Sequence, residues 1–217
     1  MKTITVKGVG KVSAKPDFVV LSLSLETIDQ SYESAINKAA EKIEELNQKL
    51  ATVGFEKEAV KTTNFNICTD YKSKKDRNGD YYSVFNGYAV KHRLKVSFDF
   101  DTNRLARALS AIATCISKPE LSIGFTVKNA SAVNEALLVS AAENAKSKAE
   151  ILYMASGVQL GDLISIDYNW GEFSIYSRTK YEVEDDLRFL DLAPTSVDIE
   201  PDDIDVSDTV TFVWQIA

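Results

Sequence analysis

The sequence has few of the residues that usually carry chemistry or separate domains. Its 217 residues include two cysteines, one histidine, four prolines and nine glycines. So few prolines and glycines argue against a linker-rich or low-complexity chain. No window approaches the ~20 consecutive apolar residues that a membrane-spanning helix needs. We therefore expect a globular protein, since a chain of this length can bury a substantial core.

The two cysteines do not indicate a metal or redox site. Cys68 and Cys115 are far apart in the sequence and lack metal-ligand spacing. In a reducing compartment we expect two free thiols. Cys115 falls on the apolar face of a predicted helix, so we assign it to core packing. Cys68 lies on the strand face opposite Phe65 and Ile67, where it can be exposed. No histidine or second cysteine is close in sequence to activate its thiol.

The N-terminal residues have the pattern of a strand rather than of a signal peptide. Apolar Ile4 and Val6 alternate with Thr3, Thr5 and Lys7, so an apolar h-region is absent. If the native chain starts where the printed sequence does, this pattern predicts a cytoplasmic protein.

The net charge of −7 is unevenly distributed. Residues 182–208 include eleven carboxylates and a single cation, Arg188, so this segment alone carries −10. The rest of the chain is close to neutral. A nucleic-acid-binding surface needs clustered positive charge. The distribution therefore argues against nucleic acid as the main partner.

Hydrophobic periodicity predicts the element order β-β-α-β-β-α-β-α-β-β. Strands are expected at residues 4–6, 19–25, 60–71, 81–101, 121–127, 163–170 and 209–216, and helices at 32–53, 102–117 and 131–156. Hairpins outnumber β-α-β units in this order. This favours an α+β fold with mainly antiparallel sheets, covered by two long helices and one shorter helix. We expect one domain over residues 1–217, with two lobes at about 1–100 and 101–217 as an alternative. Residues 171–208 are expected to be a long, acidic, irregular segment.

Three local patterns predict how particular residues are used. The third helix is rich in alanine, and small residues let a helix approach a sheet closely. Gly8 and Gly10 are expected to form a tight turn or bulge between the first two strands. A nucleotide loop at these glycines is rejected, because the third glycine and the following helix are missing. We also expect Ile116 to point inward from the second helix, and Glu45 to lie on the solvated face of the first.

Three motifs in a fixed order resemble a known family. The first is Ile4-x-Val6-x-Gly8-x-Gly10 with a following Lys-Pro-Asp, and the second is the helix end at residues 148–161. The third is the C-terminal pattern over residues 199–212, with Pro201 and Val210. Together they resemble the SIMPL-domain family, long known as domain of unknown function 541, over nearly the whole chain.

The resemblance implies an α+β fold and, in at least some relatives, ring-like or other high-order oligomers. Many bacterial relatives are exported, some are linked to oxidative-stress tolerance, and an animal relative is linked to kinase signalling. The family supplies no catalytic residue to carry over. This sequence departs from the family pattern in two ways: it lacks the export signal, and Asp202 follows Pro201 where relatives often have glycine.

Catalytic and metal-binding interpretations of single residues are weak. His92 is the only histidine and lies on an apolar strand face, which is typical of a core residue rather than of a triad or metal site. The weak candidates for divalent-cation ligands are Asp202, Asp203, Asp205 and Asp208. Their spacing lacks the turn glycine and terminal glutamate of an EF-hand, so a solvated loop is the simpler interpretation.

A predicted hairpin loop carries the clearest basic cluster. Its cations are Lys72, Lys74, Lys75 and Arg77, and its neighbouring aromatics are Tyr71, Tyr81 and Tyr82. Contact with an RNA strand, a solubilised hairpin tip, and contact with the acidic segment of a neighbouring subunit are all compatible with these residues.

The sequence favours a non-enzymatic SIMPL-like protein that acts through self-association or partner binding, with no cofactor and a stress role by family resemblance. One alternative is an enzyme with a polar cleft beneath residues 171–208. Another is a module that responds to a divalent cation through the acidic segment. Whether the protein is an enzyme is left open, with the absence of a catalytic constellation arguing against it.

Overall fold

The computed structural model describes residues 2–168, 175–179, 181–183 and 199–217. Discontinuous pieces of chain form two compact units. Unit 1 contains residues 1–17, 125–179 and 201–217, and unit 2 contains residues 18–124 and 180–200. The units do not coincide with lobes at 1–100 and 101–217, because the first strand pairs with the last.

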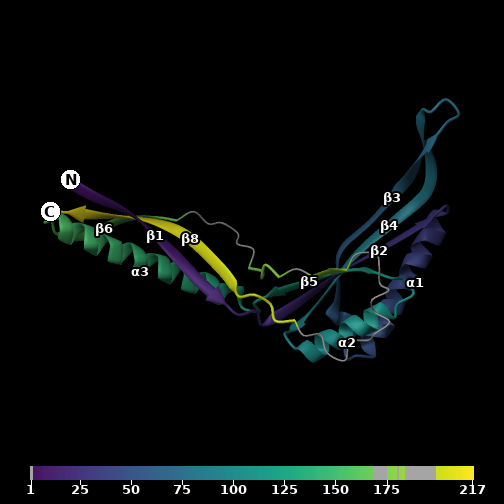
Figure 1. Cartoon of the computed structure of the whole chain (residues 1–217), viewed down its shortest axis with the longest axis horizontal. Coiled ribbons are helices and arrows are strands. Elements are labelled where there is room, and N and C mark those ends of the chain that lie inside the picture. Colours follow the sequence, from purple (N-terminus) through teal and green to yellow (C-terminus); the bar gives the residue numbers. More distant parts are fainter. Residues whose placement is uncertain (1, 169–174, 180, 184–198) are drawn as a thin grey trace. The chain divides into compact units, whose positions relative to one another are not determined.

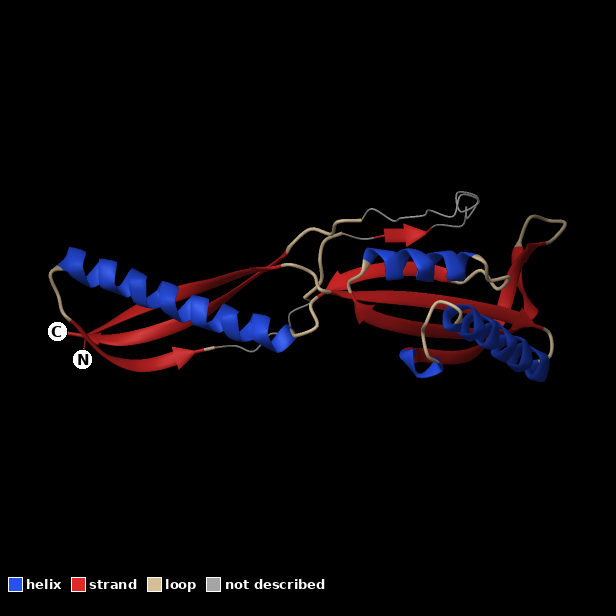
Figure 2. Cartoon of the chain, turned by 90° about the horizontal axis from the view of Figure 1, so that it is seen from below, coloured by secondary structure: helices blue, strands red, loops and turns tan. Residues whose placement is uncertain are grey.

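Unit 1 is a three-stranded antiparallel sheet with one helix along its face (Figure 2). The sheet consists of β1 (Lys2–Ala14), β8 (Ile204–Ile216) and β6 (Leu160–Asp167), in the order β1-β8-β6. The helix is α3 (Ala130–Ser156). Its fully buried alanines pack on apolar side chains of the sheet. This core consists of Val6, Ala141, Ala145, Ala149, Val210, Phe212 and Trp214.

The ends of α3 follow the capping signals in the sequence. The Asn129 side chain accepts a hydrogen bond from the backbone N–H of Ala132 at 3.1 Å, which satisfies one free donor of the first turn. Gly157 ends the helix in the left-handed conformation with φ +70°. The helix expected at 131–156 is therefore confirmed to within one residue.

Gly8 and Gly10 lie inside β1, so the expectation of a turn between the first two strands is wrong. A Cβ atom on Gly8 would lie 2.0 Å from the carbonyl oxygen of Ala141, and one on Gly10 would lie 2.2 Å from that of Leu137. These distances are far below van der Waals contact. The glycines are needed because the backbone of α3 lies directly against the strand.

Unit 2 contains a five-stranded sheet in the order β3-β4-β2-β5-β7 (Figure 1). Its strands are β2 (Phe18–Asp29), β3 (Val60–Lys75), β4 (Tyr81–Asp99), β5 (Glu120–Thr126) and β7 (Tyr181–Val183). β4 pairs antiparallel with both β2 and β3, and β5 pairs antiparallel with β7. The helical elements are α1 (Tyr32–Ala51), α2 (Thr102–Ala113) and the short 3₁₀ helix η1 (Lys57–Ala59).

α1 and α2 cover one face of this sheet, and the expectation for Ile116 is wrong while that for Glu45 is incomplete. α2 ends at Ala113, so Ile116 lies beyond the helix and is 90% exposed. Glu45 of α1 is not merely a solvated residue. Its two carboxylate oxygens accept the backbone N–H groups of Ile116 and Ser117 at 2.6 and 3.2 Å. The hydrogen bond from Ile116 is the main reason that the pKa of Glu45 is lowered.

The predicted α+β class with antiparallel sheets and three helices is confirmed. Part of the segment 171–208, which was expected to be irregular, is regular: it contains β7 and the start of β8. Residues 169–174, 180 and 184–198 lie outside the described residues, as does most of the cleft that the enzyme alternative needs.

We predict that Gly8→Ala destabilises unit 1 by about 3 kcal/mol, the upper range for overpacking, because the new methyl group meets backbone that cannot rotate away. Urea unfolding followed by tryptophan fluorescence measures the change. Gly161→Ala in β6 is the matched control, since its Cβ would lie 3.2 Å from the nearest atom. Equal losses in the two variants would contradict the close-approach explanation.

Candidate functional site

The most distinctive surface of unit 2 is an arm formed by the distal part of the β3–β4 hairpin, residues 70–87. β2 pairs with β4 only as far as the Asp29–Tyr88 pair, whereas β3 and β4 remain paired to Lys75 and Tyr81. Beyond Tyr88 the hairpin continues as a two-stranded ribbon (Figure 1). A two-stranded ribbon is only marginally stable by itself. Exposed apolar side chains that lie together on such a ribbon need an explanation, because contiguous apolar patches on a surface often mark contact sites.

A bulge marks the base of the arm. Asp70 pairs with Gly87 and Tyr71 pairs with Phe85, which leaves Asn86 as the extra residue. The Asn86 amide donates to the Asp70 carboxylate at 2.5 Å. Gly87 has φ +139°, and a Cβ there would lie 2.4 Å from the carbonyl oxygen of Asp29. The bulge therefore depends on a glycine at this position.

The bulge brings Phe85 and Tyr88 to the same face, where they lie in one row with Tyr71 of β3 and Tyr32 of α1. We call this row of four aromatic side chains the aromatic stripe. The ring centroids are 5.8 Å apart for Tyr71–Phe85, 5.4 Å for Phe85–Tyr88 and 5.5 Å for Tyr88–Tyr32, all edge to face. Tyr71, Phe85 and Tyr32 are 57%, 41% and 50% exposed. The stripe is thus an ordered apolar surface that is open to solvent.

The arm is charged, but its charges are nearly balanced. The cations Lys72, Lys74, Lys75 and Arg77 are accompanied by the carboxylates Asp70, Asp76 and Asp80. Lys75 Nζ lies 5.6 Å from the centroid of the Tyr81 ring, a cation–π contact. The Asp76 carboxylate accepts the backbone N–H groups of Asn78 and Asp80 at 2.8 and 2.9 Å, which shapes the turn. Apolar contact is therefore the stronger feature of the arm, and charge is the weaker one.

The structure places His92 in the core, as the sequence suggested. The residue is 8% exposed, and its Nε2 atom lies 2.8 Å from Thr62 Oγ1. Its ring packs edge to face on Phe65 with centroids 5.1 Å apart. Nδ1 is buried and has no hydrogen-bond partner among the described residues. Burial lowers the pKa of His92, because the charged imidazolium would lose its hydration.

We predict that the protein loses stability as the pH falls below about 6.5, the ordinary pKa of histidine. The unfolded chain then takes up a proton that folded His92 resists, so acid favours unfolding. Urea midpoints between pH 7.5 and 5.5 measure this effect. His92→Gln keeps a hydrogen-bonding partner for Thr62 but does not titrate, and it should show a flatter profile. An equal slope would contradict the assignment, since the chain has no other histidine.

Both cysteines have the burial that the sequence predicted, but Cys115 lies just beyond α2, which ends at Ala113, and not on the helix as expected. Cys115 is 3% exposed, and burial raises the pKa of its thiol to about 11, so it stays protonated. Cys68 is free and exposed on β3.

The four acidic candidates do not converge on one point. Asp205 pairs with Ser13 and Asp208 pairs with Gly10, and their spacing of three residues in β8 points them to opposite faces of the sheet. Asp202 precedes the strand. Its backbone N–H donates to Thr179 Oγ1 at 3.0 Å, and its carbonyl accepts from the Ser177 hydroxyl at 2.7 Å. Within the described parts of the chain, no three acidic, histidine or cysteine side chains group as metal ligands do.

Titration calorimetry with Ca²⁺ up to about 1 mM, the weak end of protein calcium sites, should give no saturable heat. The reason is that Asp205 and Asp208 cannot ligate one ion from opposite faces of a strand. Saturable heat that is lost in Asp205→Asn but kept in Asp162→Asn would contradict this prediction and support a site at β8.

Sequence reasoning identified Tyr71, Tyr81 and Tyr82 near the basic loop but missed the stripe. Phe85 and Tyr88 are three residues apart, so strict alternation assigns them to opposite faces. The Asn86-Gly87 pair was the available signal, because such pairs favour irregular backbone.

The described residues define the class of protein as an α+β chain with antiparallel sheets. A family model described as "Protein of unknown function (DUF541)" matches residues 4–214. The chain belongs to this family, SIMPL, as its three motifs suggested. A search of curated proteins found no match. Of the helices that the structure describes, none has the length and apolar character needed to cross a membrane.

Proposed function

We propose that this SIMPL-family protein is a non-enzymatic module that self-associates through its arm. The aromatic stripe is the observation that carries the proposal. Exposed, mutually packed aromatics are enriched at protein interfaces, because they offer large apolar area at a low cost in side-chain entropy. The stripe presents three such side chains that are each more than two-fifths exposed, of which Tyr71 and Phe85 belong to the arm and Tyr32 to α1.

A second copy of the chain is the occupant that we favour. The arm carries a small excess of positive charge, and residues 182–208 carry −10. Complementary charge of this kind orients two copies as they meet, while aromatic burial supplies the binding free energy. Cytoplasmic location and a role in stress tolerance are parts of the proposal that rest on sequence reasoning alone. No observation on the described residues favours the enzyme or the cation-responsive alternative over self-association.

Sedimentation equilibrium tests the proposal directly. We expect the wild-type protein to associate reversibly, and Tyr71→Ser or Phe85→Ser to raise the dissociation constant by ~30-fold or more, since interface aromatics are typically worth ~2 kcal/mol. Ile116→Ser is the matched control, because this residue is 90% exposed in the same unit but lies outside the arm.

Two outcomes would reject the arm as the contact. One is a wild-type protein that stays monomeric at ~100 μM. Its dissociation constant would then be too high for self-association to be the function. The other is an unchanged constant in both stripe variants. Repeating the measurement at high salt separates the two forces, since screening weakens the charge contribution and leaves aromatic burial intact.

A further inference from the structure

Side chains of α3 replace a missing neighbour strand along the free edge of β1. β1 is the outer strand of its sheet, and Lys7, Val9 and Lys11 direct backbone groups away from β8. Lys11 exchanges hydrogen bonds with the Ser140 hydroxyl at 3.2 and 3.3 Å. The Val9 N–H donates to Asn144 Oδ1 at 2.9 Å, and Lys148 Nζ donates to the Lys7 carbonyl at 3.0 Å.

We call this row of hydrogen bonds from α3 side chains to the backbone of β1 the ladder. Its spacing follows from the geometry of the helix and the strand. Four residues of helix rise about 6.0 Å, and two residues of strand span about 6.7 Å. Each turn of α3 therefore places one polar side chain opposite every second residue of β1. An uncovered edge of this kind invites pairing with another strand, and the ladder prevents it over residues 7–11.

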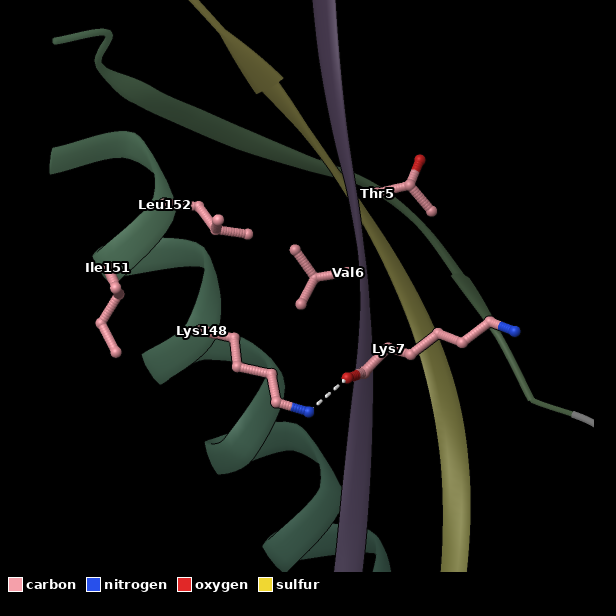
Figure 3. Close-up of a pocket in the computed structure, with 6 residues that line it drawn as sticks. All are labelled: Thr5, Val6, Lys7, Lys148, Ile151 and Leu152. Carbon is pink, nitrogen blue, oxygen red and sulfur yellow. Dashed lines mark hydrogen bonds between the residues drawn. The ribbon is translucent and has the colours of Figure 1, made fainter. Parts of the chain in front are cut away.

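The ladder stops one step later. The next pair in the series is Leu152 and Thr5, and a leucine has no group that can bond to the outward N–H and C=O of Thr5. Across the described residues, nothing else binds these two backbone groups. The surface opens at this step into a groove of about 360 Å³, lined by Thr5, Val6, Lys7, Lys148, Ile151 and Leu152 (Figure 3).

The groove combines three kinds of recognition. Thr5 offers strand pairing, and Val6 and Leu152 face one another across the gap as an apolar floor and wall (Figure 3). Ile151 and Leu152 are 64% and 47% exposed, so apolar area is available. Lys148 is the cation that faces the groove, whereas the Lys7 side chain points away from α3 and only its carbonyl faces Lys148 (Figure 3). Lys148 crosses to the strand and closes one end of the groove.

We propose that this groove binds an extended peptide of a partner protein, which adds as a strand to the edge of β1 at Thr5. An apolar side chain of the peptide packs between Val6 and Leu152, and a carboxylate meets Lys148. Strand addition of this kind takes its affinity from main-chain hydrogen bonds and its specificity from side-chain pockets. The carboxylate is that of a chain terminus or of an acidic side chain, which the experiment distinguishes. The site lies in unit 1 and does not depend on self-association through the arm.

The probe is a fluorescein-labelled pentapeptide, Thr-Val-Thr-Val-Leu with a free carboxyl terminus, followed by fluorescence anisotropy. Two companion peptides are its carboxyl amide and an amide with an added terminal Asp. We expect the free acid to bind at least 10-fold more tightly than the plain amide. Equal binding of the Asp-containing amide assigns the carboxylate to a side chain, and its failure assigns it to a chain terminus.

Three variants of the full chain test the geometry. Thr5→Pro removes the outward N–H without removing a bond to β8, and it should weaken binding at least 10-fold. Leu152→Gln should do the same, whereas Met154→Gln, a control two residues along α3 and 68% exposed, should not. Lys148→Gln keeps a donor for the Lys7 carbonyl but should abolish the preference for the free acid. Thermal unfolding verifies that each variant folds.

Absence of binding by all three peptides would overturn the proposal, as would binding that Leu152→Gln leaves unchanged. Sedimentation of Thr5→Pro and wild type should give the same association constant. Loss of self-association in Thr5→Pro would assign the edge to a second copy of the chain instead. Because the arm variants leave the groove intact, their outcome and the peptide result can be told apart.

Discussion

The backbone contact between α3 and β1 is the constraint on which unit 1 depends. Gly8 and Gly10 remove the two side-chain positions that would hold the elements apart, and alanines on α3 remove the corresponding bulk on the other side. At this separation the helix can reach past the sheet face to the strand edge. Ser140, Asn144 and Lys148 therefore hydrogen-bond to backbone groups that would otherwise be open to another strand. The close approach of α3 to β1 thus forms the core of unit 1 and lets side chains of α3 cover the edge of β1. It also determines that this cover ends at Leu152, opposite Thr5.

Unit 2 depends on a different local device. Its sheet and two helices form an ordinary core, but the bulge at Asn86 turns the β3–β4 hairpin into an arm with one aromatic side. Without the extra residue, Phe85 and Tyr88 would lie on opposite faces, and the stripe would be divided. Both units therefore place their most distinctive features on strand edges and ribbons rather than in enclosed cavities. Such features suit contacts with other polypeptide chains, because main-chain groups and aromatic surfaces recognise extended or apolar partners.

The chain belongs to the SIMPL family, and the three motifs by which its sequence resembles that family lie at structural positions. The glycines of the first motif lie under α3, the second motif contains the end of α3, and the third runs into β8 beside β1. Apart from residues 199 and 200, all three belong to unit 1. The motif residues therefore lie where α3 packs against the sheet of unit 1. The arm lies in unit 2 and outside all three motifs, whereas the open step at Leu152 lies within the second motif.

The sequence by itself determined the α+β class, the presence of three helices, the ends of the third helix to within one residue, and the buried positions of His92 and Cys115. These features follow from periodicity and capping, which are local properties of neighbouring residues. Only the tertiary structure decided the use of Gly8 and Gly10, the role of Glu45, the aromatic stripe and the groove. Each of these joins residues that are distant in sequence, as Gly8 and Ala141 are, or depends on a register shift of one residue. Alternation cannot reveal such features, because a single bulge reverses the face of every later side chain.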